Sequence, residues 1–324
     1  MSAAHPPATP RPFELPCPDL RQERVGNTGT PGVWHFDSGV AGRHVLVTAL
    51  IHGNELCGAW ALKALLAAGL APRRGKLTLA FCNLAAFDRF DAANYAASRF
   101  VEEDMNRVWS AERLADASNT PDVTRARELA PWVAQADWLL DFHSMSNADV
   151  PLQLTGLAPR NIELALALGN PACIVADAGH AAGVRLRDHG RFAVEGDPET
   201  RSLLIECGFH GDPASRDVAL DQLARFLPAS GCVDAADIPA GWLQPAAARQ
   251  QALRVTHAIA ARSTDFRFAQ PWKGLECLAQ AGTVIGWSDG EPVVTPYDRC
   301  VLIMPSLSNL RPGVTVVRLA QEIA

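Results

Sequence analysis

The chain has 324 residues, of which 48% are hydrophobic and 20% charged, and its formal net charge is −6. This composition is typical of a folded globular protein and excludes a largely disordered chain. The length favours about two domains. The net negative charge argues against a general nucleic-acid-binding protein, because neutralising phosphates requires a basic surface.

The N-terminal segment, residues 1–18, is rich in proline and alanine and lacks the apolar core of a signal peptide. No uncharged apolar stretch approaches the roughly 18 residues that a membrane helix needs. The eight cysteines show no C-x-x-C spacing, and several lie inside apolar runs. Such thiols fit a reducing compartment better than a disulfide framework. The sequence therefore predicts a cytoplasmic protein without membrane contacts.

The first part of the chain predicts strands and helices in alternation. Residues 44–51 form an apolar, β-branched run typical of a buried strand, 55–70 carry an apolar stripe at helical spacing, and 76–83 predict a second core strand. This β-α-β order favours a parallel connection. Further strands are predicted over 33–39, 138–142, 172–176 and 202–207, and further helices over 124–134, 161–168 and 216–227.

A change of composition marks the second part of the chain. Proline, glycine and alanine become frequent around residues 231–245, and we expect a domain boundary near Pro245. Short strands separated by turn residues follow it, over 253–260, 282–287, 291–295, 301–304 and 315–319. The sequence predicts an α/β domain over 1–245 and a small all-β domain over 246–324.

His52 and Glu55 follow the first buried strand at H-x-x-E spacing. Open α/β sheets build their sites at the carboxyl ends of strands, and imidazole and carboxylate groups are ligands of zinc. As a pair they could equally end the strand and begin the helix, where a carboxylate is favourable. His143 also follows an apolar strand and would reach the same sheet edge. Three protein ligands with an open fourth position are the pattern of catalytic zinc.

Two further carboxylates accompany these residues. Asp141, two positions before His143, is placed to accept a hydrogen bond from a ligand imidazole, although an isolated aspartate is more often a surface or capping residue. Glu206 lies inside an apolar strand, where an unpaired carboxylate is costly. It either pairs with an arginine or stands at the same sheet edge with a raised pKa, as a general base.

A long irregular segment over residues 84–118 separates the second core strand from the next helix, and such segments tend to be functional. It contains Arg99, Asn106 and Arg107. Guanidinium groups on a loop suit carboxylate binding and the stabilisation of an oxyanion. The alternative is solvated surface arginines paired with the neighbouring acidic residues of 102–104.

In this order, H-G-N-E at 52–55, D-x-N-R at 104–107, D-x-H at 141–143 and the strand glutamate Glu206 resemble the succinylglutamate desuccinylase/aspartoacylase family of the zinc carboxypeptidase-like superfamily. The resemblance covers about residues 44–210 and extends loosely over the C-terminal part. It implies an α/β fold, a three-layer α/β/α domain with a mixed central sheet, and a small β domain that caps the active-site cleft.

The resemblance also implies a reaction: zinc-dependent hydrolysis, by metal-activated water, of a small N-acyl amino acid or a related linear amide. The partner is then a small molecule, the cofactor one Zn²⁺ per chain, and homo-oligomerisation is left open. It assigns zinc binding to His52, Glu55 and His143, support of a ligand to Asp141, general base and acid catalysis to Glu206, carbonyl polarisation to Arg99, and carboxylate binding to Asn106 and Arg107.

The chain departs from this pattern in its substrate-binding residues. Aspartoacylase binds the substrate carboxylate partly through a tyrosine of its C-terminal domain, whereas the tyrosines of this chain are Tyr95 and Tyr297, the latter in a different local context. The further arginine that binds the acidic side chain has three candidates, Arg187, Arg191 and Arg201. The acyl group and amino acid therefore stay open.

Two other functions remain at this point: a metallocarboxypeptidase that acts on peptides, and a non-catalytic relative that binds a small acid. An intact ligand set together with Glu206 argues against the second, because a binding protein needs no base. The sequence lacks the G-x-S-x-G, G-x-x-x-x-G-K-[ST] and G-x-G-x-x-G motifs, which disfavours a serine hydrolase, a P-loop NTPase and a Rossmann dehydrogenase.

Overall fold

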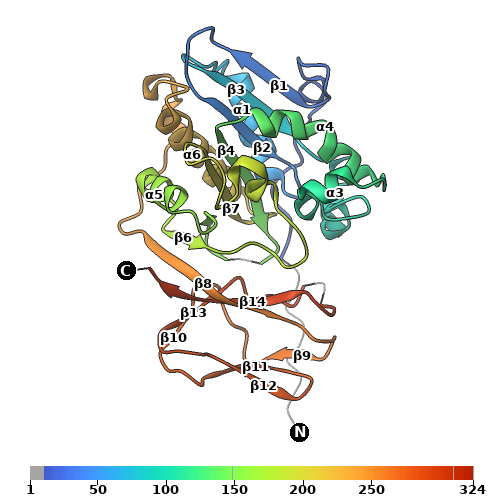
Figure 1. Ribbon diagram of the computed structural model, residues 1–324, viewed down its shortest axis with the longest axis vertical. Coiled ribbons are helices and arrows are strands. Elements are labelled where there is room, and N and C mark those ends of the chain that lie inside the picture. Colours follow the sequence, from blue (N-terminus) through green and yellow to red (C-terminus); the bar gives the residue numbers. More distant parts are fainter. Residues whose placement is uncertain (1–10, 148, 309, 324) are drawn as a thin grey trace.

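The computed structural model describes residues 11–147, 149–308 and 310–323. An α/β part with helices on both faces of a sheet lies above a purely β part in Figure 1. The α-helices are α1 (Leu56–Ala67), α2 (Leu84–Phe87), α3 (Ala111–Ala115), α4 (Pro121–Gln135), α5 (Pro159–Leu168) and α6 (Pro213–Ser230). The predicted α/β fold class is confirmed.

Most strands of the described residues belong to one 11-stranded sheet in the order β1-β3-β2-β4-β7-β5-β6-β8-β14-β13-β10. The strands are β1 (Val33–Asp37), β2 (His44–Ala49), β3 (Lys76–Phe81), β4 (Trp138–Met145), β5 (Leu152–Leu154), β6 (Cys173–Ala176), β7 (Arg201–Phe209), β8 (Gln251–Ala260), β9 (Phe266–Phe268), β10 (Cys277–Leu278), β11 (Val284–Ser288), β12 (Glu291–Val294), β13 (Cys300–Ile303) and β14 (Thr315–Glu322). β3, β2, β4 and β7 are parallel, whereas β1 pairs antiparallel with β3 and β5 pairs antiparallel with β7, so the sheet is mixed.

The central strands are apolar because helices cover both of their faces. Every residue of β2 and β4 is buried, as expected of parallel strands between two helical layers. One hydrophobic cluster joins α1, α5 and α6 to one face, and a second joins α4 to the other. Together these clusters form the three layers.

Helix ends account for the differences from the predicted ranges. α4 begins three residues before its predicted start because Thr120 accepts a hydrogen bond from the Val123 amide and Pro121 occupies the first turn. α6 likewise begins at Pro213 after an aspartate cap, Asp212. The short strands β5, β9 and β10 escaped prediction because two or three residues show no periodicity.

The β part continues the main sheet. β8 pairs in parallel with β6, and β14, β13 and β10 follow it as antiparallel neighbours. A separate three-stranded sheet has the order β12-β11-β9. The expected boundary near Pro245 falls between the 3₁₀ turn Ala240–Trp242 and β8, and the division into two domains stays a prediction. Within the described residues, no helix has both the length and the apolar character needed to cross a membrane.

Candidate active site

The loop after β2 delivers the first two candidate ligands. His52 and Glu55 are separated by Gly53 and Asn54, and an added Cβ at Gly53 would lie 2.4 Å from backbone atoms of Ala86 and Phe87. Only glycine therefore lets this loop pass so close to α2. Glu55 then stands at the N-cap position of α1, where the helix fixes its direction.

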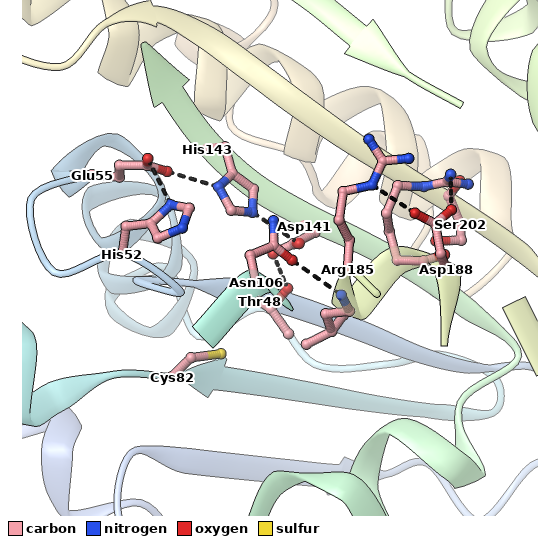
Figure 2. A network of polar contacts seen from close by, with 12 residues as sticks. Thr48, His52, Glu55, Cys82, Asn106, Asp141, His143, Arg185, Asp188 and Ser202 are labelled. Atoms are coloured by element: carbon pink, nitrogen blue, oxygen red, sulfur yellow. Dashed lines mark hydrogen bonds and ion pairs between the residues drawn. The ribbon is translucent and has the colours of Figure 1, made fainter. Parts of the chain in front are cut away.

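Three side chains converge at this edge of the sheet. The Nδ1 atoms of His52 and His143 lie 2.8 Å from the Oε1 and Oε2 atoms of Glu55, respectively. Candidate ligand atoms of the three residues all lie within 4.8 Å of one another, and all three residues are buried. Figure 2 shows the two imidazoles facing the Glu55 carboxylate. The three predicted metal ligands are thus brought together.

A second carboxylate binds the outer nitrogen of each imidazole. His52 Nε2 lies 2.9 Å from Asp104 Oδ1, and His143 Nε2 lies 2.9 Å from Asp141 Oδ2. Thr48 donates to the other Asp141 oxygen at 2.7 Å. These contacts favour the tautomer that carries its proton on the outer nitrogen and would present Nδ1 to a cation. Sequence reasoning gave Asp104 no role here, although it begins the D-x-N-R motif.

The electrostatics of the cluster also fit a divalent cation. Burial alone would raise the pKa of Glu55, but the positive charges of His52 and His143 hold that pKa well below its usual value. Burial would lower the pKa of His143, but the carboxylates of Asp141 and Glu55 raise it well above its ordinary value. The protonated imidazole of His143 thus compensates neighbouring carboxylates here. A borderline-soft cation with nitrogen and oxygen ligands, such as zinc, compensates them equally well.

Glu206 lies beside His143 on the neighbouring strand, because β4 and β7 pair His143 with Glu206 in parallel register. Burial, followed by the negative charge of Glu55, raises the pKa of Glu206 to about 8. Its Oε2 atom is buried without a hydrogen-bond partner, and it forms no ion pair with any residue that the structure describes. Of the two interpretations of Glu206, the geometry favours the carboxyl at the sheet edge.

Arg99 extends from the 3₁₀ segment Ala92–Ser98 toward the same edge. Its guanidinium lies 3.3 Å from Glu55 Oε1 and 3.1 Å from Asp104 Oδ2. Burial opposes its charge, but Asp104 and Glu55 raise the pKa of Arg99. Arg99 is therefore held as a fixed cation beside the three candidate ligands, rather than as a solvated surface arginine.

Asn106 and Arg107 lie in the 3₁₀ turn Met105–Arg107 but have different surroundings. Asn106 is buried. Its side-chain oxygen accepts from the backbone N–H of Leu186 at 3.1 Å, and its backbone N–H donates to Asp104 Oδ1 at 2.8 Å. Arg107 donates to the Asn106 carbonyl at 2.7 Å, and it pairs with no carboxylate in the described chain. Asn106 thus fixes the turn Met105–Arg107, and the Arg107 guanidinium forms no ion pair with the described residues.

The three candidates for a further substrate-binding arginine do not reach this edge. Arg187 is buried and donates to the carbonyls of Thr155 and Ser202, so it supports the scaffold. Arg191 contacts Asp137, which precedes β4, and Arg201 begins β7. Both therefore lie at the opposite ends of strands that carry His143 and Glu206 at their carboxyl ends.

Ser144 and His210 form a buried pair that the sequence did not indicate. The Ser144 amide donates to Glu55 Oε2 at 3.2 Å, and its hydroxyl lies 2.8 Å from His210 Nδ1. Burial lowers the pKa of His210 to about 4. The pair orients the Glu55 carboxylate through Oε2, whereas Arg99 contacts Oε1. No local sequence motif predicts this pair.

The mixed α/β fold described above is shared with known proteins. The family model of the Succinylglutamate desuccinylase/Aspartoacylase catalytic domain matches residues 41–185. No curated protein sequence matches the chain significantly.

Solved structures resemble the fold over most of its length. Succinylglutamate desuccinylase from Vibrio cholerae superposes with a TM-score of 0.65 at 14% identity, covering 90% of this chain and 86% of that one. The enzyme from Chromobacterium violaceum gives 0.63 at 17% identity, covering 91% and 89%. A succinylglutamate desuccinylase/aspartoacylase from Rhodobacter sphaeroides gives 0.61 at 17%, covering 88% and 87%.

The solved structures show that this chain is an α/β protein with the fold of the succinylglutamate desuccinylases. Residues 41–185 are similar to the catalytic domain of the succinylglutamate desuccinylase/aspartoacylase family. The resemblance drawn from the sequence motifs is thereby confirmed. The matched range contains His52, Glu55 and His143, whereas Glu206 lies beyond it.

Proposed function

We propose that the chain is a zinc-dependent hydrolase that cleaves the amide bond of a small N-acyl amino acid. The observation that carries this proposal is the convergence of His52, Glu55 and His143, with Glu206 in register beside His143. The family of the catalytic domain supports amide hydrolysis as the reaction class.

The proposed metal ligands are His52 Nδ1, His143 Nδ1 and the Glu55 carboxylate. Asp104 and Asp141 would hold the two imidazoles in the tautomer that leaves Nδ1 free. When bound, zinc acts as a Lewis acid that polarises a carbonyl and makes water nucleophilic at neutral pH.

Glu206 is the proposed general base and acid. Its buried, unpartnered Oε2 is free to accept the proton of the attacking water and to return it to the leaving amine. A pKa raised to about 8 by burial and by Glu55 keeps proton uptake and release both accessible near neutral pH. Because β7 is buried from Ser202 onward, this carboxyl keeps a fixed position.

Arg99 and Arg107 have separate proposed roles. Arg99, held by Glu55 and Asp104, would donate to the oxyanion that develops on the scissile carbonyl. Arg107, with Asn106 fixing its loop, would bind the substrate carboxylate. The strands beyond residue 245 are proposed to cap this edge, and a cytoplasmic location remains a prediction.

The proposal is tested by a hydrolysis screen over N-acetyl, N-succinyl and N-formyl amino acids with added zinc. The expected result is release of the free amino acid by wild-type protein and its loss in Glu206→Gln with zinc content unchanged. The exposed Glu195→Gln is the matched control. Long peptides with a free C-terminus are tested alongside. Cleavage of these peptides from their C-terminus, with no N-acyl amino acid hydrolysed, would instead indicate a carboxypeptidase.

A further inference from the structure

A cluster of cations lies next to the proposed metal site and includes a residue of the C-terminal strands. Arg318 of β14 donates through its Nη2 atom to His180 Nε2 at 2.7 Å. The charges of Arg185 and Arg318 both act on Arg107. No role has been assigned to Arg318 or His180 so far.

Only one of the three arginines in the cluster is neutralised. Arg185 binds both oxygens of Asp177, at 2.7 and 2.9 Å. Arg318 reaches the same carboxylate only at 3.9 Å, and its side chain is only 13% exposed. Arg107 pairs with no carboxylate among the described residues. Neither Arg107 nor Arg318 therefore has a carboxylate at hydrogen-bond distance among the described residues.

Keeping two such charges together is unfavourable for the protein alone. Burial, and then the charges of Arg99, Arg185 and Arg318, lower the pKa of Arg107 to about 10. Burial lowers the pKa of Arg318 as well. An anion bound between Arg107 and Arg318 would relieve this repulsion, and guanidiniums bind carboxylates with two parallel hydrogen bonds.

His180 would contribute a neutral donor to such an anion. Burial, and then the charges of Arg107 and Arg318, lower the pKa of His180 to about 3. Its ring is therefore uncharged at neutral pH. Because Nε2 accepts from Arg318, the proton resides on Nδ1, which can donate a hydrogen bond.

Backbone contacts hold this cluster against the loop that carries Arg107. An added Cβ at Gly183 would lie 2.1 Å from the Arg107 carbonyl oxygen, so only glycine allows this approach. Val184 forms an isolated bridge with Val108. The negative charge of Glu206 acts on Arg318, so the cluster lies within electrostatic range of the proposed catalytic carboxyl.

We propose that Arg318 is a substrate-binding residue and that, with Arg107, it binds the carboxylate of the N-acyl amino acid. This inference rests on the proposed function for the identity of the substrate. It assigns selection of anionic over neutral substrates to the C-terminal strands.

The direct test is calorimetric titration of zinc-loaded protein with glutarate, a small dicarboxylate. Charge-assisted hydrogen bonds lost in Arg318→Gln should raise the Kd roughly 10–100-fold. The same change at Arg254, which is exposed on the neighbouring strand β8, should leave the Kd unchanged. No binding to wild-type protein, or equal affinity in Arg318→Gln, overturns the proposal.

Arg318→Lys is the second variant, and it keeps the test valid if Arg318→Gln does not fold. Lysine retains the charge but loses the planar fork, so an intermediate Kd is expected. A Kd for Arg318→Lys equal to that of wild-type protein would show that no bidentate contact exists and would overturn the proposal.

Thermal unfolding without ligand separates a binding role from a structural one. Removing an unneutralised, desolvated charge should leave the Tm of Arg318→Gln equal to or above that of wild-type protein. A clearly lower Tm with unchanged glutarate affinity would make Arg318 a structural residue.

Failure of the proposed function has a different signature. If zinc-loaded protein hydrolyses no N-acyl amino acid but still binds glutarate through Arg318, the reaction is wrong and the anion site stands. If hydrolysis occurs and Arg318→Gln slows a carboxylate substrate and its neutral primary-amide analogue by the same factor, the anion site is wrong and the reaction stands.

Discussion

Two neighbouring regions of the molecule carry opposite charges. At the carboxyl ends of β2 and β4, a carboxylate oxygen lies against each of the two ring nitrogens of His52 and of His143. Next to them, neither Arg107 nor Arg318 has a carboxylate at hydrogen-bond distance among the described residues. We propose that the first region binds a cation and the second an anion. Each region therefore makes its own predictions.

Loss of a ligand should have the largest effect on the cation region. His143→Ala removes one of three proposed metal ligands, and zinc content should fall from about one equivalent to near zero. Amide hydrolysis should fall by on the order of 10³-fold or more, because metal and carbonyl polarisation are lost together. Elemental analysis and the rate of amino-acid release measure both. Full zinc content in this variant would remove His143 from the site.

Glu206→Gln should separate chemistry from metal binding. The amide cannot accept a proton, so kcat should fall roughly 10²–10⁴-fold. Zinc content should match wild-type protein, because the proposed ligands are untouched. Wild-type kcat in a zinc-loaded Glu206→Gln protein would contradict the role of Glu206.

The outer carboxylates should matter less than the ligands. Asp104→Asn and Asp141→Asn each weaken the hydrogen bond that orients one imidazole. Zinc affinity should fall about 10–100-fold in each variant, as measured by competition with a chelator. An effect in Asp141→Asn alone would show that Asp104 serves only Arg99 and the loop.

The pH dependence of stability should report on Glu206 in zinc-free protein. Its pKa is about 8 in the folded state, above the ordinary value near 4.3 expected in the unfolded chain. The folded state therefore binds the proton more tightly, and the stability this provides is present below pH 4 and is lost as pH rises toward 8.

Glu206→Gln should remove this loss. Relative to wild-type protein, the variant should gain stability between pH 5 and pH 8, by an amount on the order of a few kcal/mol. Urea unfolding at the two pH values measures the difference, with Glu195→Gln as control. A constant difference between variant and wild-type protein would mean that the Glu206 carboxyl has an ordinary pKa.

The sequence predicted the cation region well and the anion region poorly, for a physical reason. His52, His143 and Glu206 each follow or interrupt an apolar strand, Glu55 comes three positions after His52 at the start of α1, and parallel pairing brings these residues to one edge. Arg318 is instead brought to His180 by the antiparallel pairing of β14 with β8 and by the parallel pairing of β8 with β6. That contact depends on how distant strands join, which local periodicity does not encode.

The same reasoning explains two smaller differences. Arg187 was one candidate for the arginine that binds an acidic side chain, but it is buried against carbonyls of Thr155 and Ser202. Asp104 looked like a salt-bridge partner, but it also holds His52. Both outcomes were decided by contacts between loops and strands, whose geometry a short motif does not specify.

The measurement that tests the central claim most directly is zinc content together with hydrolysis, on wild-type protein and His143→Ala. The account predicts about one zinc per wild-type chain, release of an amino acid from at least one N-acyl amino acid, and loss of both in the variant. Wild-type protein that takes up no zinc when supplied with it, and gains no hydrolytic activity, would contradict the account.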